Sequence, residues 1–519
     1  MKQSVFRRVH RNDDGRKKLL EGINELYEAV SSTLGAAGKT VILEEAVTGV
    51  PYPTKDGVTV AEYIEPFDPV ANLGASFLRE AAKKTAEIAG DGTTTSVVLA
   101  HAILDKAIPK LKDNNFRQLI EGIKRGRDKV LKELENKATE VTESNLIDIA
   151  SISANNDKVL GALIAEAYTK VGIDGTVVIG ESKTNSTYIE VLDGSSINSG
   201  AASHHFLGDA TKLKFDKANI LILDQKLSNI WKIQDILEGA IKSGDPLLII
   251  GELDQAPLAT LAMNKIKNGF KICVIEPPLH GNQRKAVLLD LAKLTGAKVV
   301  GEEYGNSLET VSFDNLGQAK SITIEQNRTI FQFNDDARED LEDLVATLKE
   351  QLPESEGAQR GLIKYRLNLL TGKLAEIKVG AVTQTAFKEL RDRVDDAVRA
   401  TQCALEEGIV PGGGVVLKDI TTKLFKDAKS DGERILYLAL TAPMYKIASN
   451  AGLDLKDFPE VDKRGKGLDV LRGKVVSAKS EGIIDPVKVT KNAVINAVEV
   501  ANTVLGTDII VTNLRQSDI

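Results

Sequence analysis

Six consecutive residues, Gly90-Asp91-Gly92-Thr93-Thr94-Thr95, place one carboxylate and three hydroxyl groups on a turn that contains two glycines. Glycine leaves backbone amides open to the close approach of anionic oxygen atoms. Asp91 can hold Mg²⁺, and the threonine hydroxyls can bond phosphate or metal. The segment equally fits a turn followed by a helix cap, because Asp and Thr both cap helices. The six residues alone leave both interpretations open.

Four other acidic or glycine-rich positions have an ordinary structural interpretation beside a functional one. Asp56, before Gly57, is interpreted as part of a turn between apolar strands. Asp396 follows Asp395 in a predicted helix over residues 391–405, where adjacent carboxylates usually face solvent. Asp485 precedes a proline and fits a helix cap. Three glycines at 412–414 are harder to explain by a plain turn, because each costs backbone entropy; the approach of a ligand to the backbone is one explanation.

The segment Gly35-Ala36-Ala37-Gly38-Lys39-Thr40 is not a P-loop, although it resembles one. The P-loop needs a glycine five residues before Gly38, where this chain has Thr33, and it must follow a strand. Here the preceding residues predict a helix. The two glycines can still offer backbone amides to a phosphate.

Composition narrows the class of protein. The chain has 519 residues, 42% of them hydrophobic, which predicts a globular protein of two to four domains. Its net charge is −7 and its basic residues are dispersed, so we expect no nucleic-acid partner. Apolar runs fall short of the ~18 residues of a membrane span, so no membrane partner is expected. With only two cysteines, Cys273 and Cys403, we predict a reducing, cytoplasmic environment.

The elements that must position these residues fall into two patterns. Apolar residues at three- and four-residue steps predict a helix over 16–32, and helical patterns continue to about residue 172. Between about 175 and 340, short apolar runs predict buried strands at 176–179, 220–223, 247–250, 272–275 and 298–300. A helix over 337–352 follows. We therefore expect an α/β middle inserted into a helical domain that is built from both termini.

Taken in order, the motifs resemble those of the group I chaperonins, the GroEL type, over nearly the whole chain. The matching segments are 33–41, 53–58, 90–95, 151–155, 393–397, 406–414 and 483–486. The resemblance implies a multi-domain α and α/β fold with a helical equatorial ATP-binding domain, a small α/β intermediate domain and an α/β apical domain inserted in the middle. The implied boundaries are 1–136 and 407–519 for the equatorial domain, 137–192 and 375–406 for the intermediate domain, and 193–374 for the apical domain.

The resemblance also implies an ATP site with Mg²⁺, and it allows for K⁺. By analogy Asp91 holds the metal, while Asp56 and Asp396 orient the hydrolytic water and support the metal. Asp396 would reach the nucleotide only when the intermediate domain closes, which makes hydrolysis depend on a conformational step. The implied nucleotide contacts are Thr33, Leu34, Gly35, Lys55, Asp91, Gly92, Thr93, Thr94, Thr95, Ile152, Gly413, Ile483 and Asp485.

For the partners, the resemblance implies non-native client proteins, a homo-oligomeric single or double ring for which seven-fold symmetry is favoured, and a co-chaperonin lid as an optional partner. The client surface is expected on two apical helices and on an extended segment over 200–206. The residues expected there are Phe206, Ile230, Trp231, Ile233, Leu237, Leu258, Ala262 and Met263.

Several positions depart from the family pattern. Ser199 and Gln384 stand where the family has an arginine and a glutamate that join neighbouring subunits. In the family, three residues line the adenine pocket. The corresponding residues here are Asp469-Val470-Leu471, but they lie in a shifted segment, so no base contact is assigned to them. These changes indicate a divergent chaperonin.

Two other functions remain as alternatives. A small-molecule phosphotransferase would use Asp91 and Asp396 around Mg·ATP, but the sequence has no obvious acceptor-binding residues. A ring-forming scaffold or holdase would hydrolyse ATP weakly; the presence of Asp56, Asp91 and Asp396 argues against a complete loss of ATPase activity.

Overall fold

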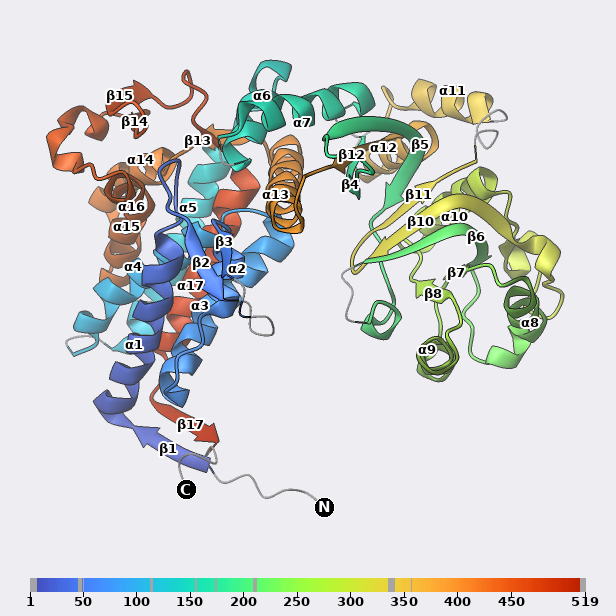
Figure 1. Cartoon of the computed structure of the whole chain (residues 1–519), viewed down its shortest axis with the longest axis horizontal. Helices are drawn as coiled ribbons and strands as arrows, with labels where there is room; N and C mark the ends of the chain where they lie inside the picture. The colour runs from blue at the N-terminus through green and yellow to red at the C-terminus, as the bar shows by residue number, and fades with distance from the viewer. Residues whose placement is uncertain are drawn as a thin grey trace. The chain divides into compact units, whose positions relative to one another are not determined.

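The computed structural model describes residues 7–44, 49, 51–112, 115–154, 156–172, 175–208, 212–334, 341–355 and 357–513. The chain divides into two compact units. We call residues 1–166, 181–188 and 379–519 the terminal unit, and residues 167–180 and 189–378 the central unit. An α/β middle inserted between two mostly helical halves is therefore what the structure has (Figure 1). The finer division into three domains stays a prediction.

Long amphipathic helices form the core of the terminal unit, and their ends are set by local sequence. In α3, Asp68 accepts hydrogen bonds from the amides of Val70 and Ala71, Pro69 opens the helix, and Gly90 ends it with a left-handed φ of 69°. Helices α1, α3, α4, α5 and α17 share one apolar core. The helices are α1 (Asn12–Ser31), α2 (Gly57–Tyr63), α3 (Pro69–Ala89), α4 (Thr93–Ala107), α5 (Phe116–Lys137), α6 (Glu143–Ser153), α7 (Lys158–Val171), α13 (Gln384–Glu407), α14 (Val415–Leu424), α15 (Asp431–Ala439), α16 (Ala442–Asn450) and α17 (Val487–Leu505). Helix α7 continues into the central unit.

The terminal unit contains short antiparallel strand pairs, of which β1–β17 and β13–β16 join segments far apart in the sequence. The pairs are β1 (Arg7–Arg11) with β17 (Ile509–Asn513), β2 (Val41–Glu44) with β3 (Pro51–Thr54), β13 (Ile409–Pro411) with β16 (Ile484–Pro486), and β14 (Lys466–Asp469) with β15 (Lys474–Ser477). The first pair joins the two ends of the described chain.

A mixed sheet forms the centre of the central unit. Its order is β4-β12-β5-β11-β10-β6-β7-β8, and β9 pairs with β6. Strands β7, β8 and β9 run parallel to their partners, as expected for strands that each follow a helix. The strands are β4 (Thr176–Glu181), β5 (Tyr188–Ile197), β6 (Lys212–Leu223), β7 (Leu247–Ile250), β8 (Ile272–Ile275), β9 (Val299–Val300), β10 (Gly317–Glu325), β11 (Thr329–Gln332) and β12 (Lys373–Val379).

Further α-helices of the central unit lie around this sheet (Figure 1), and the buried sides of several of them share one apolar core with the strands. They are α8 (Gln234–Ser243), α9 (Gln255–Asn268), α10 (Gly281–Thr295), α11 (Glu342–Gln351) and α12 (Gly357–Thr371).

Three local expectations were wrong. Asp56 is not in a turn between strands: it caps the N-terminus of α2. The first predicted apical helix is split, because a 3₁₀ turn over Ile230–Ile233 precedes α8. Residues 200–206 are not one extended segment, because His204–Phe206 form a 3₁₀ turn. Asn155, the first residues of the helix predicted from 337, and the tail beyond Asn513 lie outside the described residues.

None of the helices in the described part of the chain combines the length and apolar character that a bilayer crossing demands.

A buried ion pair joins two helices of the central unit. Arg366 of α12 donates from Nε and Nη2 to the two carboxylate oxygens of Asp290 on α10, at 2.7 and 2.8 Å. The Asp290 side chain is only 1% exposed. This pair therefore holds α10 and α12 together in a place from which water is excluded.

We expect Asp290→Ala to destabilise the central unit by about 3–5 kcal/mol, because it leaves the Arg366 charge without its partner. Denaturant unfolding followed by the fluorescence of Trp231, the chain's one tryptophan, reports on this unit. Asp216→Ala is the control, because Asp216 is 79% exposed and its pair with Lys214 is long at 4.0 Å; it should cost less than about 1 kcal/mol. Equal effects of the two substitutions would contradict the prediction.

Candidate functional site

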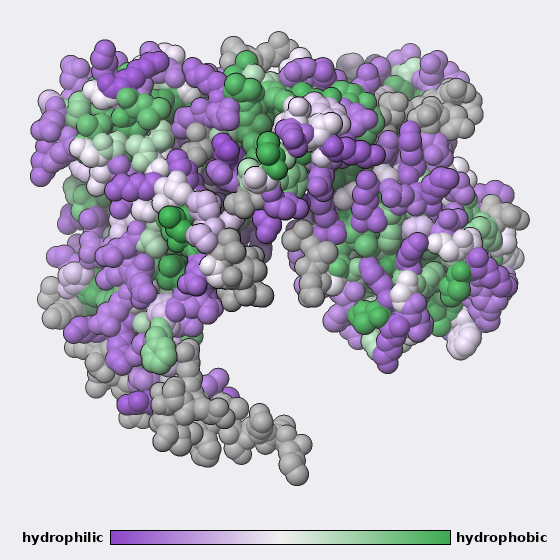
Figure 2. Space-filling model, viewed as in Figure 1, coloured by the Kyte–Doolittle hydropathy of each residue, from purple (hydrophilic) through white to green (hydrophobic). Residues whose placement is uncertain are grey.

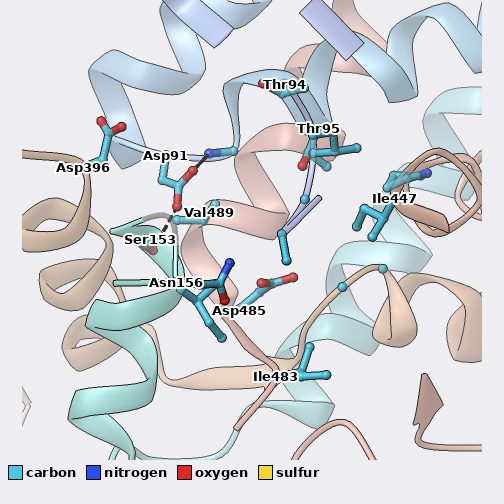
Figure 3. A pocket seen from close by; sticks show the side chains of 18 of the residues that line it. Asp91, Thr94, Thr95, Ser153, Asn156, Asp396, Ile447, Ile483, Asp485 and Val489 are labelled. Atoms are coloured by element: carbon cyan, nitrogen blue, oxygen red, sulfur yellow. Dashed lines mark hydrogen bonds between the residues drawn. The ribbon is translucent and has the colours of Figure 1, made fainter. Parts of the chain in front are cut away.

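A cavity of about 620 Å³ opens in the terminal unit. It is in the size range of cofactor and small-ligand sites. Every residue that the sequence assigned to the nucleotide contacts lines it, together with Asp56 and Asp396. These residues come from both halves of the chain, and Figure 3 shows several of their side chains around one space.

The N-terminus of α4 forms one wall. Gly92 is the N-cap, with φ 82°, and no side chain caps the first helical amides. A Cβ atom at Gly92 would lie 2.7 Å from Cγ1 of Val489, so the turn needs glycine both for its φ and for this contact. Uncapped amides and the helix dipole both favour an anion at this end.

The loop after α1 lies beside this wall. The Thr33 hydroxyl is 3.3 Å from that of Thr94, which joins the loop to α4. The Asn450 side chain donates to the carbonyl oxygens of Ser31 and Leu34, both at 2.9 Å. Thr33, Leu34 and Gly35 are thus held by the protein's own hydrogen bonds.

Carboxylates from different segments crowd the cavity. Asp91 accepts hydrogen bonds from the Gly92 amide and, at 3.0 Å, from the Ser153 hydroxyl of α6. Burial nevertheless raises the pKa of Asp91, and the charge of Asp56 adds to this. Burial, followed by the charges of Asp56 and Asp91, holds the pKa of Asp396 well above its usual range. A cation in the cavity would relieve this repulsion.

Two further acids complete the cluster. Burial raises the pKa of Asp485 to about 7, although the Gly413 amide donates a hydrogen bond to it. Burial and the charge of Asp56 raise the pKa of Asp392, one turn before Asp396 on α13, to about 6. Asp395, by contrast, pairs with Arg399 at 2.7 Å and is not among the residues that line the cavity. Asp56 accepts from the amides of Val58 and Thr59 in its capping role.

The residues expected on the client surface are divided between core and surface in the central unit. Phe206, Ile233 and Ala262 are buried, at 0, 1 and 4% exposure, so they belong to the core and not to the expected surface. Trp231 is 71% exposed and Met263 is 44% exposed. Ile230, Leu237 and Leu258 are partly buried against the core. Figure 2 shows apolar residues at the surface over α9 and next to α8.

Comparison with known proteins agrees with this architecture. Residues 26–515 match the TCP-1/cpn60 chaperonin family. The chain therefore belongs to the TCP-1/cpn60 chaperonin family. Its fold is similar to that of the chaperonin gp146 from the bacteriophage EL 2 (Pseudomonas aeruginosa). One crystal form of gp146 aligns with a TM-score of 0.77 and 22% identity over 99% of this chain and 100% of that one. A second form aligns with a TM-score of 0.67 and 22% identity over 98% and 99%.

Several residues of the chaperonin cavity were not found from sequence. Ser153, which bonds Asp91, and Asp392 both line it, as do Asp148 and Ile447. Residues 468–472, from the end of β14 into the turn before β15, line it as well; they include Asp469-Val470-Leu471, for which no base contact was predicted. Helical spacing could have indicated Asp392, which lies four residues before Asp396 and so shares its helical face. The others come together only through contacts between distant segments.

The raised pKa of Asp485 predicts that the nucleotide-free protein is less stable at high pH than at low pH. The folded protein holds this proton up to about pH 7, whereas the unfolded chain loses it near its ordinary value of 3.8. Stability therefore falls as the pH rises from about 4 to about 7. Asp485→Asn removes this penalty and keeps an acceptor for the Gly413 amide, so we expect the nucleotide-free variant to exceed wild type in stability at pH 8, by a few kcal/mol at most.

Thermal and denaturant unfolding at pH 5 and pH 8 measure this difference, which should shrink at the lower pH. Asp427→Asn, at an exposed position in the same unit, should leave the stability unchanged at both. A variant that is less stable than wild type at pH 8 would contradict the assignment.

Proposed function

We propose that the terminal unit binds and hydrolyses Mg·ATP, and that this drives the folding of client proteins bound to the central unit. The observation that carries the proposal is the meeting of the uncapped α4 N-terminus with carboxylates from several chain segments in one cavity. The crystals of the similar phage chaperonin were obtained in the presence of ATP-BeFx, which supports a nucleotide in this fold.

The α4 wall suits the phosphates. The amides and hydroxyls of Gly92 to Thr95, with the loop of Thr33 to Gly35, would bind phosphate oxygens, and Lys55 at the cavity edge adds a positive charge. Asp91 would hold Mg²⁺, whose role when bound is to neutralise charge on the transferred phosphate. Ile152, Gly413, Ile483 and Asp485 are assigned to the base and sugar. K⁺ stays a prediction without a defined site.

Hydrolysis is assigned to Asp56 and Asp396. Asp56 is fixed by its capping hydrogen bonds, whereas Asp396 comes from α13 and from the other half of the chain. We infer that the two carboxylates orient the attacking water between them. Movement of α13 would then control when hydrolysis occurs. This assigns segments 137–192 and 375–406 to an intermediate domain, between an equatorial domain (1–136, 407–519) and an apical domain (193–374).

We expect Asp396→Ala to keep ATP binding and to lower the rate of hydrolysis by about 10²-fold or more, because the water loses its orienting base. Phosphate release and equilibrium binding measure the two quantities separately. Asp395→Ala is a matched control on the next residue, because that side chain pairs with Arg399. An Asp396 variant that hydrolyses ATP at the wild-type rate would remove this role.

Client binding is assigned to the exposed apolar side chains at α8 and α9. Trp231 is held by a hydrogen bond from its amide to the Asn229 side chain, at 3.1 Å, and its own side chain is 71% exposed. A large aromatic side chain that is left exposed is a strong interaction residue. Met263 is also exposed, and Ile230, Leu237 and Leu258 are partly buried against the core.

We expect Trp231→Ala to weaken the binding of a chemically unfolded protein by about tenfold, because it removes the largest exposed apolar group. Competition binding of a fluorescently labelled unfolded protein measures the change. Leu289→Ala, at a position 42% exposed on α10, is the control and should have little effect. Equal losses would show that the site is not centred on Trp231.

Assembly follows from the same proposal. We propose a homo-oligomeric single or double ring, with seven subunits favoured and a co-chaperonin lid as an optional partner. A cytoplasmic location stays a prediction. The small-molecule phosphotransferase is not favoured, because family membership accounts for the site and for the exposed apolar surface together. The weakly hydrolysing holdase is tested by the Asp396 experiment, because a slow wild-type enzyme would show little further loss.

A further inference from the structure

One side of the cavity is lined by apolar side chains, Ile447 and Ile483 among them. Ile447 packs on Gly35, where an added Cβ would lie 2.9 Å from its Cγ1. Ile483 shares an apolar cluster with Leu468 of the β14–β15 hairpin. Figure 3 shows Ile447 and Ile483 apart from Asp91 and Asp396. With the phosphates at α4, the flat apolar base of a nucleotide would lie against these side chains.

The charged side chains at the hairpin turn already have hydrogen-bond partners within the protein. The Asp469 carboxylate accepts from the amides of Leu471 and Arg472, at 3.1 and 3.2 Å. Arg472 donates from Nη1 to Glu481 at 3.1 Å. Leu471, which is 65% exposed, adds only an apolar surface at the cavity. These hydrogen bonds occupy the turn's carboxylates, so the turn offers mainly apolar contact to a base.

Asp148 of α6 is different. It lines the cavity, one turn before Ile152, and it makes no hydrogen bond or ion pair with any residue that the structure describes. Its carboxylate lies against Gly482, where an added Cβ would come within 2.7 Å of Oδ2. Gly482 directly precedes Ile483. The free carboxylate is therefore next to the apolar side of the cavity, and an ionised carboxylate can only accept hydrogen bonds.

We propose that Asp148 determines base specificity by accepting a hydrogen bond from the exocyclic amino group of adenine; this inference rests on the proposed nucleotide site. The amino group is the one N–H donor of the adenine base in ATP. Asp148 is exposed in the structure, so with a base that has no amino group in this position the carboxylate keeps only its contact with water and this hydrogen bond is lost. The residue acts on the base alone and takes no part in hydrolysis.

The test is a double-mutant cycle between Asp148 and the amino group. Wild type and Asp148→Ala are titrated, in the presence of Mg²⁺, with ATP and with purine riboside triphosphate, which differs from ATP only in having hydrogen in place of the amino group. Wild type should bind ATP about ten- to hundredfold more tightly, the strength of a hydrogen bond to a charged group. In Asp148→Ala the two affinities should agree within about twofold.

Comparing the ratio of the two nucleotide affinities cancels the general effect of removing the Asp148 charge. Loss of one negative charge near the triphosphate strengthens both nucleotides alike. Asp148→Asn should keep part of the preference, because its amide oxygen still accepts. Asp427→Ala, at an exposed position of the terminal unit, should keep the full wild-type ratio.

The outcomes separate this inference from the proposed function. If wild type binds neither nucleotide, the proposed ATP site is wrong and the inference falls with it. If wild type binds ATP but Asp148→Ala keeps the wild-type ratio, Asp148 does not contact the base, and the ATP site stands without it. If only Asp148→Ala loses the ratio, the carboxylate and the amino group are coupled as proposed.

Discussion

Helices α1 and α3 approach so closely that backbone touches backbone. A Cβ atom added at Gly22 of α1, or at Gly74 of α3, would overlap the backbone of the facing helix. Helix α1 runs directly into the loop of Thr33 to Gly35, and α3 runs into the turn of Gly90 to Gly92. This contact therefore helps to set the separation of the two loops, both of which line the cavity. Larger residues at Gly22 or Gly74 would not permit this spacing of α1 and α3, on which the shape of the cavity depends.

The carboxylates of the site, by contrast, oppose folding, because folding buries them close to one another. Asp56, Asp91, Asp396 and Asp485 come from four separate segments, and folding brings them together in one cavity. The raised pKa values of Asp91, Asp396 and Asp485 reflect the cost of burying these carboxylates beside one another. Carboxylates arranged in this way favour the binding of a cation. The binding of a metal and nucleotide would then stabilise the junction of the two chain halves. Asp396, on α13, is one of the acids whose repulsion would be relieved.

Features that depend on residues close together in the sequence were predicted more accurately than features that depend on the folded surroundings. The apolar runs at 247–250 and 272–275 coincide with β7 and β8, because a strand covered on both faces has no polar alternation to obscure it. Asp56 was misassigned because Asp-Gly before alternating apolar residues is typical of a turn, whereas here Asp56 caps a short helix. Ile233 and Ala262 were misassigned because an apolar helix face has the same pattern in a core as on a binding surface, and Phe206, expected on an extended segment, is buried in a 3₁₀ turn.

Helix α13 shows where a local rule could have gone further. Asp395 and Asp396 are neighbours in sequence, but about 100° separates successive side chains around a helix, so they cannot both enter one cavity. Asp392 lies four residues before Asp396 and shares its face, and Asp395 instead reaches Arg399 four residues on. The helical period thus separates the acids that face the cavity from the one that does not. The contacts of Asp148 and Gly482 follow no such rule, because only the folded chain brings α6 to the residues before β16.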